Sequence, residues 1–381
     1  MNRRQLLASV AAASLIGFSG MTAAQAASVN VGVSVSSTGP AASLGIAQKN
    51  SVELLPKTLG GLPVNYVILD DATDPSQAGR NARRFVDAEK VDAIIGSTTV
   101  PTSLAVAEVA TEAGIPQIAL APFTPREPKW VFPIPQSVAV MSQALMEHMR
   151  DTGIKTLGFI GFSDAYGEAW LNDVTKRAES HGVKLVAAER YARTDQSVVA
   201  QVLKLMAAKP DAIIVAGSGT PAALPMRTLG QRGYKQPIYQ THGAANNDFL
   251  RTAGASAQGV VLPTGLILVA EQLPADHPSR AVGLGYLKAY EGAHGEGSRN
   301  PFGAYAHDAY LLLDVAVAKA AKAGQPGTPE FRAALRDALE QTKEVALTHG
   351  MATMSPTDHS GLGDAARALI TVQDGAWKLI D

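Results

Sequence analysis

The sequence predicts a two-domain α/β protein with mainly parallel sheets. Short runs of β-branched residues alternate with longer helical patterns, and a proline-rich break separates two such series. Strands that alternate with helices imply β-α-β units, in which neighbouring strands run in the same direction. In addition, a chain of 381 residues exceeds what one hydrophobic core usually supports, so two domains are expected.

The amino-terminal 26 residues have the pattern of a secretion signal. Arg3-Arg4 supplies positive charge, Leu6 to Phe18 is apolar, and Ala24-Gln25-Ala26 provides small residues before a cleavage site. The apolar run is shorter than the roughly 20 residues that span a bilayer. We therefore expect cleavage after Ala26 and export to the periplasm. A buried helix or a membrane anchor is the alternative, and the arginine pair leaves the twin-arginine route open beside general secretion.

The first series is expected to start directly after the signal. Strands are predicted at residues 29–35, 64–69, 91–95 and 116–120, with helices ending near 56 and covering 76–88 and 103–111. Asp74-Pro75 has the form of a helix start, with aspartate as the cap and proline in the first turn. Asp70, Asp71 and Asp74 together could instead bind a cation, but a strand-end turn followed by a cap is the favoured interpretation.

A break at residues 122–135 ends this series, because five prolines in that segment disfavour a helix or a central strand. A second series follows. It has strands at 156–161, 183–188, 212–216 and 237–239 and helices at 165–180, 198–208 and 221–232. Beyond Pro263 helices are expected at 281–290, 305–323 and 329–342, and short strands at 368–372 and 377–380 complete a sheet.

Composition excludes several classes of function. The chain has 33 basic and 34 acidic residues and no basic stripe, which argues against nucleic acid and anionic lipid as partners. It contains no cysteine, so disulfides, thiolate catalysis and cysteine metal sites are impossible. We expect no cofactor, no bound metal and no membrane-embedded part, and a monomer is the default.

Motifs of common enzymes are also missing. Gly217-Ser218-Gly219 is too short for a hydrolase nucleophile elbow, and Gly283-Leu284-Gly285 lacks the third glycine of a dinucleotide loop. The histidines are scattered without metal-ligand spacing. The protein is therefore not expected to be an enzyme, although an exported α/β hydrolase remains a remote alternative.

Several short motifs in order carry a resemblance to a known family. They are Ser-Thr-Gly-Pro at residues 37–40, Leu-Asp-Asp-Ala-Thr-Asp-Pro at 69–75, Ile-Gly-Ser at 95–97 and Asp-Ala-Tyr-Gly at 164–167. In this order and spacing, over essentially the whole mature chain, the sequence resembles the leucine/isoleucine/valine-binding family of periplasmic substrate-binding proteins that serve ABC transporters.

The resemblance implies two Rossmann-like lobes that are joined by three crossing segments and close on a ligand. The first lobe would comprise residues 27–137 and 266–346, and the second 138–265 and 347–381. The crossings would lie near residues 135–139, 261–266 and 345–350. The partners implied are a small carboxylate and the permease and ATPase subunits of an importer. A ligand sensor is an alternative with the same fold.

Two first-lobe loops would hold the ligand carboxylate, as the resemblance implies. They contain Ser97, Thr98 and Thr99 in one loop and Ala119, Ala121, Phe123 and Thr124 in the other. Both loops follow predicted strands, and ligands of open α/β sheets bind beyond the carboxyl ends of the strands. The first loop also precedes a helix, whose amino end favours an anion. Helix capping alone could equally explain its hydroxyl groups.

On the second lobe, Tyr166 corresponds to an aromatic wall of the family's site. Ser218, Gly219 and Thr220 open a helix after a strand and should face the same cleft. Phe302 and Tyr305 lie where a first-lobe aromatic residue commonly closes the pocket. For each of these aromatic residues, ordinary core packing is the alternative.

His242 marks a departure from the family pattern. Members that bind amino acids have an acidic residue near this position to pair with the ligand ammonium, whereas residues 240–243 here are Gln-Thr-His-Gly. Burying an ammonium without an opposite charge is strongly unfavourable. The sequence therefore favours a carboxylate ligand without an α-amino group, with an aromatic acid as the leading candidate and His242 at its far polar end. A branched-chain or other amino acid is the alternative ligand.

Overall fold

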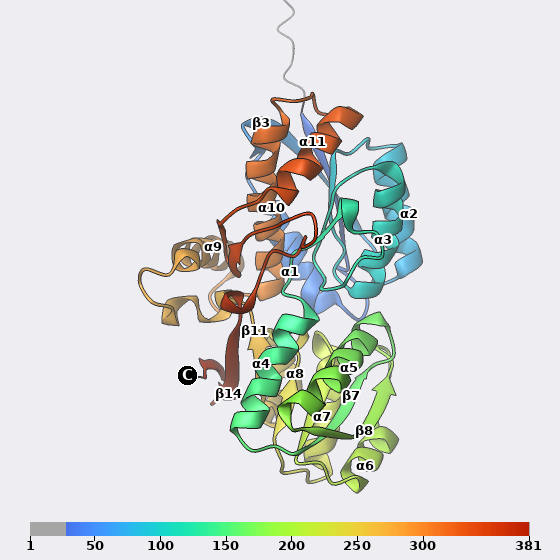
Figure 1. Ribbon diagram of the computed structural model, residues 1–381, viewed down its shortest axis with the longest axis vertical. Helices are drawn as coiled ribbons and strands as arrows, with labels where there is room; N and C mark the ends of the chain where they lie inside the picture. The colour runs from blue at the N-terminus through green and yellow to red at the C-terminus, as the bar shows by residue number, and fades with distance from the viewer. Residues whose placement is uncertain (1–27, 381) are drawn as a thin grey trace, which may run out of the picture.

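The computed structural model describes residues 28–380, which form two lobes stacked along the long axis of the molecule (Figure 1). Each lobe contains a sheet dominated by parallel strands, with helices packed on it. The predicted two-lobed α/β fold is therefore confirmed. The predicted signal and its cleavage site at Ala26 lie outside the described residues. Within residues 28–380, no helix has the length and apolarity needed to cross a membrane.

The sheet of the first lobe has the strand order β2-β3-β1-β4-β5-β6. Its strands are β1 (Val29–Val35), β2 (Thr58–Leu59), β3 (Leu62–Asp70), β4 (Ala93–Gly96), β5 (Gln117–Ala119) and β6 (Val131–Pro133). All pairs except β2 with β3 are parallel. Strand β6 falls within the proline-rich segment, where no strand was predicted. It lies at the edge of the sheet, the position in which a strand tolerates proline.

Helices cover both faces of this sheet. They are α1 (Ala42–Glu53), α2 (Pro75–Asp87), α3 (Val100–Ala113), α10 (Pro301–Ala320) and α11 (Pro329–Glu340). Because successive strand residues point to opposite faces, Ile95 packs in the cluster below α1 and α10, while Ile94 packs in the cluster below α2 and α3. Burial on both faces explains why these strands are continuous apolar runs.

The sheet of the second lobe has the order β15-β14-β11-β10-β9-β7-β8. Its strands are β7 (Thr156–Phe162), β8 (Lys184–Tyr191), β9 (Ala212–Ala216), β10 (Ile238–Gln240), β11 (Val261–Thr264), β14 (Ala368–Gln373) and β15 (Ala376–Leu379). The last two are antiparallel additions to a parallel sheet. The helices of this lobe are α4 (Val138–Asp151), α5 (Ala165–Ala178), α6 (Val199–Ala207), α7 (Ala223–Gln231) and α8 (Asn247–Ala253).

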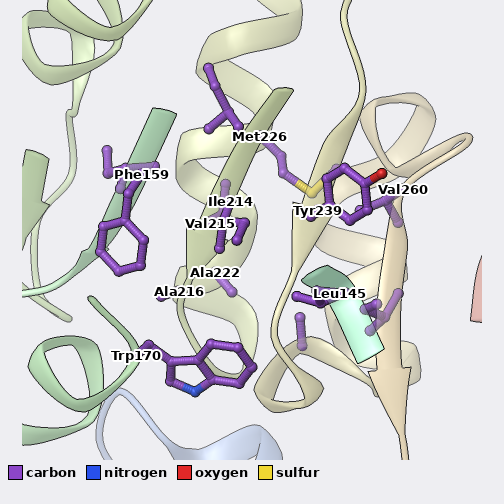
Figure 2. Packing of buried hydrophobic residues seen from close by; sticks show 14 of the residues in the cluster. Leu145, Phe159, Trp170, Ile214, Val215, Ala216, Ala222, Met226, Tyr239 and Val260 are labelled. Atoms are coloured by element: carbon purple, nitrogen blue, oxygen red, sulfur yellow. The ribbon is translucent and has the colours of Figure 1, made fainter. Parts of the chain in front are cut away.

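The core of the second lobe joins side chains from strands and helices that are distant in sequence. Figure 2 shows Phe159 of β7, Ile214 of β9 and Tyr239 of β10 together with Leu145 of α4 and Trp170 of α5. The Trp170 side chain is fully buried. This core fixes the carboxyl ends of β7, β9 and β10, from which the loops of the cleft extend.

The chain passes between the lobes three times: between β6 and α4, after β11, and before β14. The third position corrects the predicted crossing at residues 345–350. Those residues belong instead to a hairpin of β12 (Val345–Leu347) and β13 (Gly350–Ala352). Leu347 and Ala366 both pack in a first-lobe cluster, so the chain leaves that lobe only just before Ala368. Helix α9 (Pro278–His294) packs beside this hairpin.

Candidate functional site

A cleft between the lobes is lined by the loops at the carboxyl ends of both parallel sheets. Its wall consists of Leu44, Thr98, Thr99, Val100, Leu120, Ala121, Pro122, Pro135, Tyr166, Arg193, Ser218, His242, Gly243, Phe302 and Tyr305. The enclosed space is about 20 Å³, which is room for one water molecule. The lobes are thus closed, and an organic ligand can enter only if they separate or if the lining side chains move.

Most of the predicted site residues meet at this cleft. Thr98, Thr99, Ala121, Tyr166, Ser218, His242, Phe302 and Tyr305 all belong to its wall. Six of them lie just beyond the carboxyl ends of parallel strands, which meet at the cleft. Phe302 and Tyr305 belong to the first turns of α10.

The other predicted residues lie elsewhere. Ser97 is buried beneath the wall, Ala119 is within β5, and Thr124 is exposed to solvent. Phe123 packs against the core of the second lobe. Gly219 and Thr220 are not part of the wall, although Gly219 closely approaches Leu44 and Ser43 of the first lobe, where a methyl group would lie 2.7 Å from each.

The hydroxyl groups of the first-lobe loop are committed to a buried network around Asp71. The Asp71 carboxylate accepts hydrogen bonds from Ser34, Ser36 and Ser97 at 2.9, 2.6 and 2.5 Å. Thr98 donates to Gln48 Oε1 at 2.5 Å. Burial raises the pKa of Asp71, and the serine hydrogen bonds oppose that shift. Ser97 and Thr98 therefore support the conformation of the loop, and Thr98 also belongs to the cleft wall.

Asp74 accepts a hydrogen bond from the Gln77 amide at 2.6 Å and caps α2. The favoured interpretation of the Asp70-Asp71-Asp74 cluster is confirmed for this residue. Within residues 28–380, no group of three histidine or acidic side chains has an arrangement suited to a metal ion.

The amino end of helix α3 faces the cleft, but most of the backbone amide groups of that end already donate hydrogen bonds to residues of the helix and its cap. The Thr99 side chain accepts from the Thr102 amide, and the Thr102 hydroxyl accepts from the Thr99 amide at 3.1 Å. Pro101 has no amide hydrogen. Among residues 28–380, the Val100 amide is the donor of this first turn that has no partner.

Arg193 is the charged side chain of the wall, and sequence reasoning missed it. Its side chain is 11% exposed and forms an ion pair with Asp164, with 2.6 Å between Nε and Oδ2. A second nitrogen, Nη1, donates to the Ser218 hydroxyl at 2.9 Å. Its Cζ atom lies 4.1 Å from the centre of the Phe162 ring. The available signal was position, because Arg193 lies two residues beyond the carboxyl end of β8.

His242 belongs to the cleft wall, whose lining contains no carboxylate. Burial, with a further contribution from His349, lowers the pKa of His242 to about 3 and keeps the imidazole neutral. Its Nδ1 atom is buried and has no hydrogen-bond partner among residues 28–380. The ring packs against Tyr166 and Trp170, with centroid separations of 6.3 and 5.8 Å. Tyr166 in turn donates to the Thr241 hydroxyl at 2.8 Å.

Tyr305 connects the cleft to the crossing segments. Its hydroxyl donates to Gln136 Oε1 at 2.6 Å, and its ring stacks on His349 with a centroid separation of 3.7 Å. Gln136 Nε2 donates to the Ala366 carbonyl at 2.5 Å, while His349 contacts the Asp308 carboxylate at 2.8 Å. Tyr305 therefore contacts Gln136 beside the first crossing and, through Gln136, Ala366 beside the third.

A wider groove of about 590 Å³ lies in the second lobe, at the end of the sheet that faces away from the cleft, near His148, Tyr234 and Val261. All its lining residues belong to one lobe, so closure of the lobes cannot enclose a ligand there. The interlobe cleft, although smaller in this closed state, is the site that both halves of the molecule build.

Two lobes that face each other across strand-end loops define a class of proteins that enclose a small ligand by closing. A comparison with family models matches residues 28–376 to the periplasmic binding protein family. The chain therefore belongs to the periplasmic binding proteins.

Individual relatives agree with this assignment. An extracellular ligand-binding receptor from Rhodopseudomonas palustris HaA2 is 46% identical and superposes with a TM-score of 0.91, with coverage of 93% of this chain and all of that one. The protein Rp1789 from R. palustris CGA009 is 47% identical with the same coverage and TM-score. The Leu/Ile/Val-binding protein homolog 3 of Brucella melitensis is 25% identical over 93% of both chains.

Membership implies an extracytoplasmic location, a small-molecule ligand and an ABC transporter as partner. These relatives are binding proteins and receptors by name, in keeping with a role in capture. 

Proposed function

We propose that this protein captures an organic carboxylate without an α-amino group, with an aromatic acid as the preferred ligand, and delivers it to an ABC importer. The observation that carries the proposal is the charge of the cleft wall. Arg193 is cationic, His242 is neutral, and none of the lining residues carries a carboxylate.

An amino acid would bring an ammonium group into this cleft. The desolvation of that charge would be uncompensated, because the nearest acidic groups are already occupied. Asp164 pairs with Arg193, and Asp71 is enclosed by serine hydroxyls. An acid without an ammonium avoids this cost, and Tyr166, Phe302 and Leu44 offer apolar surface to an aromatic ring.

Closure follows from ligand contacts on both lobes. A ligand that touches Thr99 on one lobe and Ser218 on the other binds the closed form better than the open one, and so shifts the population toward it. The closed form would then be the state that the permease recognises. Amino-acid binding is a second candidate, which the name of the Brucella relative favours.

Calorimetric titration of ligand-free, refolded protein tests the proposal. We expect 4-hydroxybenzoate or a related aromatic acid to bind, and leucine not to bind. Small-angle scattering should show a smaller radius of gyration with the acid than without it. Binding of leucine with no response to aromatic acids would establish the second candidate instead, and an unchanged radius at saturation would argue against capture by closure.

A further inference from the structure

We propose that Arg193 on the second lobe, and not the first-lobe loops, binds the acid group of the ligand. This inference rests on the proposed function and deepens it, because it assigns the orientation of the ligand in the cleft. The acid end would lie against the guanidinium beside Ser218, and the remainder of the ligand would extend along the cleft.

The guanidinium is held in place before a ligand arrives. Asp164 fixes Nε, Ser218 fixes Nη1, and the Phe162 ring supports the flat face of the group. The remaining nitrogen, Nη2, has no hydrogen-bond partner among residues 28–380, and the side chain belongs to the cleft wall. An arginine anchored in this way loses little side-chain freedom when it binds a carboxylate.

Asp164 does not cancel the charge of Arg193. Its Oδ1 atom caps α5 by accepting from the amides of Tyr166 and Gly167 at 2.9 and 3.3 Å, while Oδ2 accepts from Arg193. The positive end of the α5 dipole therefore shares the carboxylate with the guanidinium. The sum of arginine, aspartate and helix end leaves net positive potential at this side of the cleft.

The first lobe offers much less to an anion. The Ser97 and Thr98 hydroxyls donate to Asp71 and Gln48, and the Thr99 hydroxyl takes part in the capping box of α3. The Val100 amide remains, supported by a helix dipole that is worth about half a charge. A guanidinium with a free nitrogen forms a charge-assisted hydrogen bond to a carboxylate, which is stronger than the hydrogen bond that a neutral amide offers.

His242 completes this orientation. Its buried Nδ1 atom lacks a partner, and its loop adjoins Ser218 through a hydrogen bond from the Gly219 amide to the Gly243 carbonyl at 2.9 Å. A neutral imidazole can donate a hydrogen bond to a ligand hydroxyl or accept one from it. An acid with a hydroxyl substituent would thus satisfy both groups.

The test compares an acid with its neutral amide on two proteins. Wild type should bind 4-hydroxybenzoate about 100-fold more tightly than 4-hydroxybenzamide, because a hydrogen bond to a charged group is lost with the amide. The Arg193→Gln variant should bind both equally weakly, and Arg193→Lys should recover part of the preference. Arg190→Gln, which removes an exposed arginine near the end of β8, serves as the control and should retain it.

Retention of the full acid preference by Arg193→Gln would overturn the inference and assign the acid to the first lobe. Thermal melting of the variant provides the check on folding. Binding of leucine in place of aromatic acids would refute the proposed function separately. The same comparison, with leucine and leucinamide, would then decide whether Arg193 binds the carboxylate.

Discussion

The loops of the two lobes that face each other across the cleft are built alike but use their polar groups differently. In the first lobe, Ser97, Thr98 and Thr99 hydrogen-bond to other residues of the same lobe. In the second lobe, Arg193 and His242 belong to the cleft wall, and each has a side-chain nitrogen without a hydrogen-bond partner among residues 28–380. A hydroxyl group at a strand end is therefore not by itself evidence of ligand binding, because it can already donate its hydrogen bond to a buried acceptor of the same lobe. In the proposal made above, the first lobe supplies a stable platform and the second lobe supplies the groups that bind the ligand.

The strongest test of the platform is Asp71→Ala. This change removes the acceptor of three buried serine hydroxyls, so the free energy of unfolding should fall by about 3 kcal/mol. Urea denaturation measures the loss. Asp74→Ala, which removes only the exposed cap of α2, should cost about 1 kcal/mol. Equal losses in the two variants would show that the buried network contributes no more to the free energy of unfolding than an exposed helix cap does.

The next prediction concerns His242 and the pH dependence of stability. The unfolded chain protonates this imidazole below about pH 6.5, whereas the folded chain holds its pKa at about 3. The unfolded state therefore binds more protons between these values, and stability falls as the pH drops through this window. At pH 5, protonation of His242 in the unfolded state lowers the free energy of unfolding by about 2 kcal/mol.

Urea denaturation at pH 7 and pH 5 measures this effect. His242→Gln should lose less stability than wild type over that interval, by about 2 kcal/mol. The exposed His294 offers a control, since His294→Gln should behave as wild type does. An identical pH response in all three proteins would contradict the buried, neutral assignment of His242.

Thr99→Ala separates capping from binding at a residue that lines the cleft. Loss of the capping box should destabilise the protein by about 1 kcal/mol. Affinity for an aromatic acid should change by less than Arg193→Gln changes it. Calorimetry and denaturation of the same preparation give both quantities. A large loss of affinity without a loss of stability would restore Thr99 as a ligand-binding hydroxyl.

The smallest effect is expected at the exposed ion pair of Arg190 and Glu168. Both side chains are solvent accessible, at 46% and 38%, so Arg190→Gln should alter the free energy of unfolding by about 0.5 kcal/mol or less. A loss well above this value would mean that surface pairs of β8 matter as much as the anchored Arg193. Denaturation of the variant beside wild type measures it.

Much of the fold could be predicted because its signals are local. Residues 29–35 and 212–216 were predicted as strands and form β1 and β9 with the same bounds. The Asp74-Pro75 start of α2 was also predicted, from a cap and a proline in adjacent positions. Strand β6 was missed, because the prolines in and around it disfavour a strand everywhere except at an edge, and edge position is a property of the whole sheet.

The location of the candidate site could be predicted from the sequence, whereas the contacts of its individual residues could not. Strand ends and the family resemblance together identified eight of the lining residues, because parallel strands place their carboxyl ends at one edge of a sheet. Phe302 and Tyr305 lie in α10 and came from the resemblance alone. The partners of Ser97 and Thr98, at Asp71 and Gln48, lie 26 and 50 positions away in sequence. No pattern in the neighbouring sequence indicates a hydrogen-bond partner at that separation.

The sequence by itself determined the alternation of strands and helices, the caps that start α2 and α5, and the absence of a carboxylate at position 242. These features depend on neighbours within a few turns of the chain. Tertiary structure alone decided that Arg193 faces the cleft, that the loop hydroxyls turn inward and that the third crossing lies near residue 367. Each of these outcomes depends on the packing of segments that are distant in the chain, which no local pattern encodes.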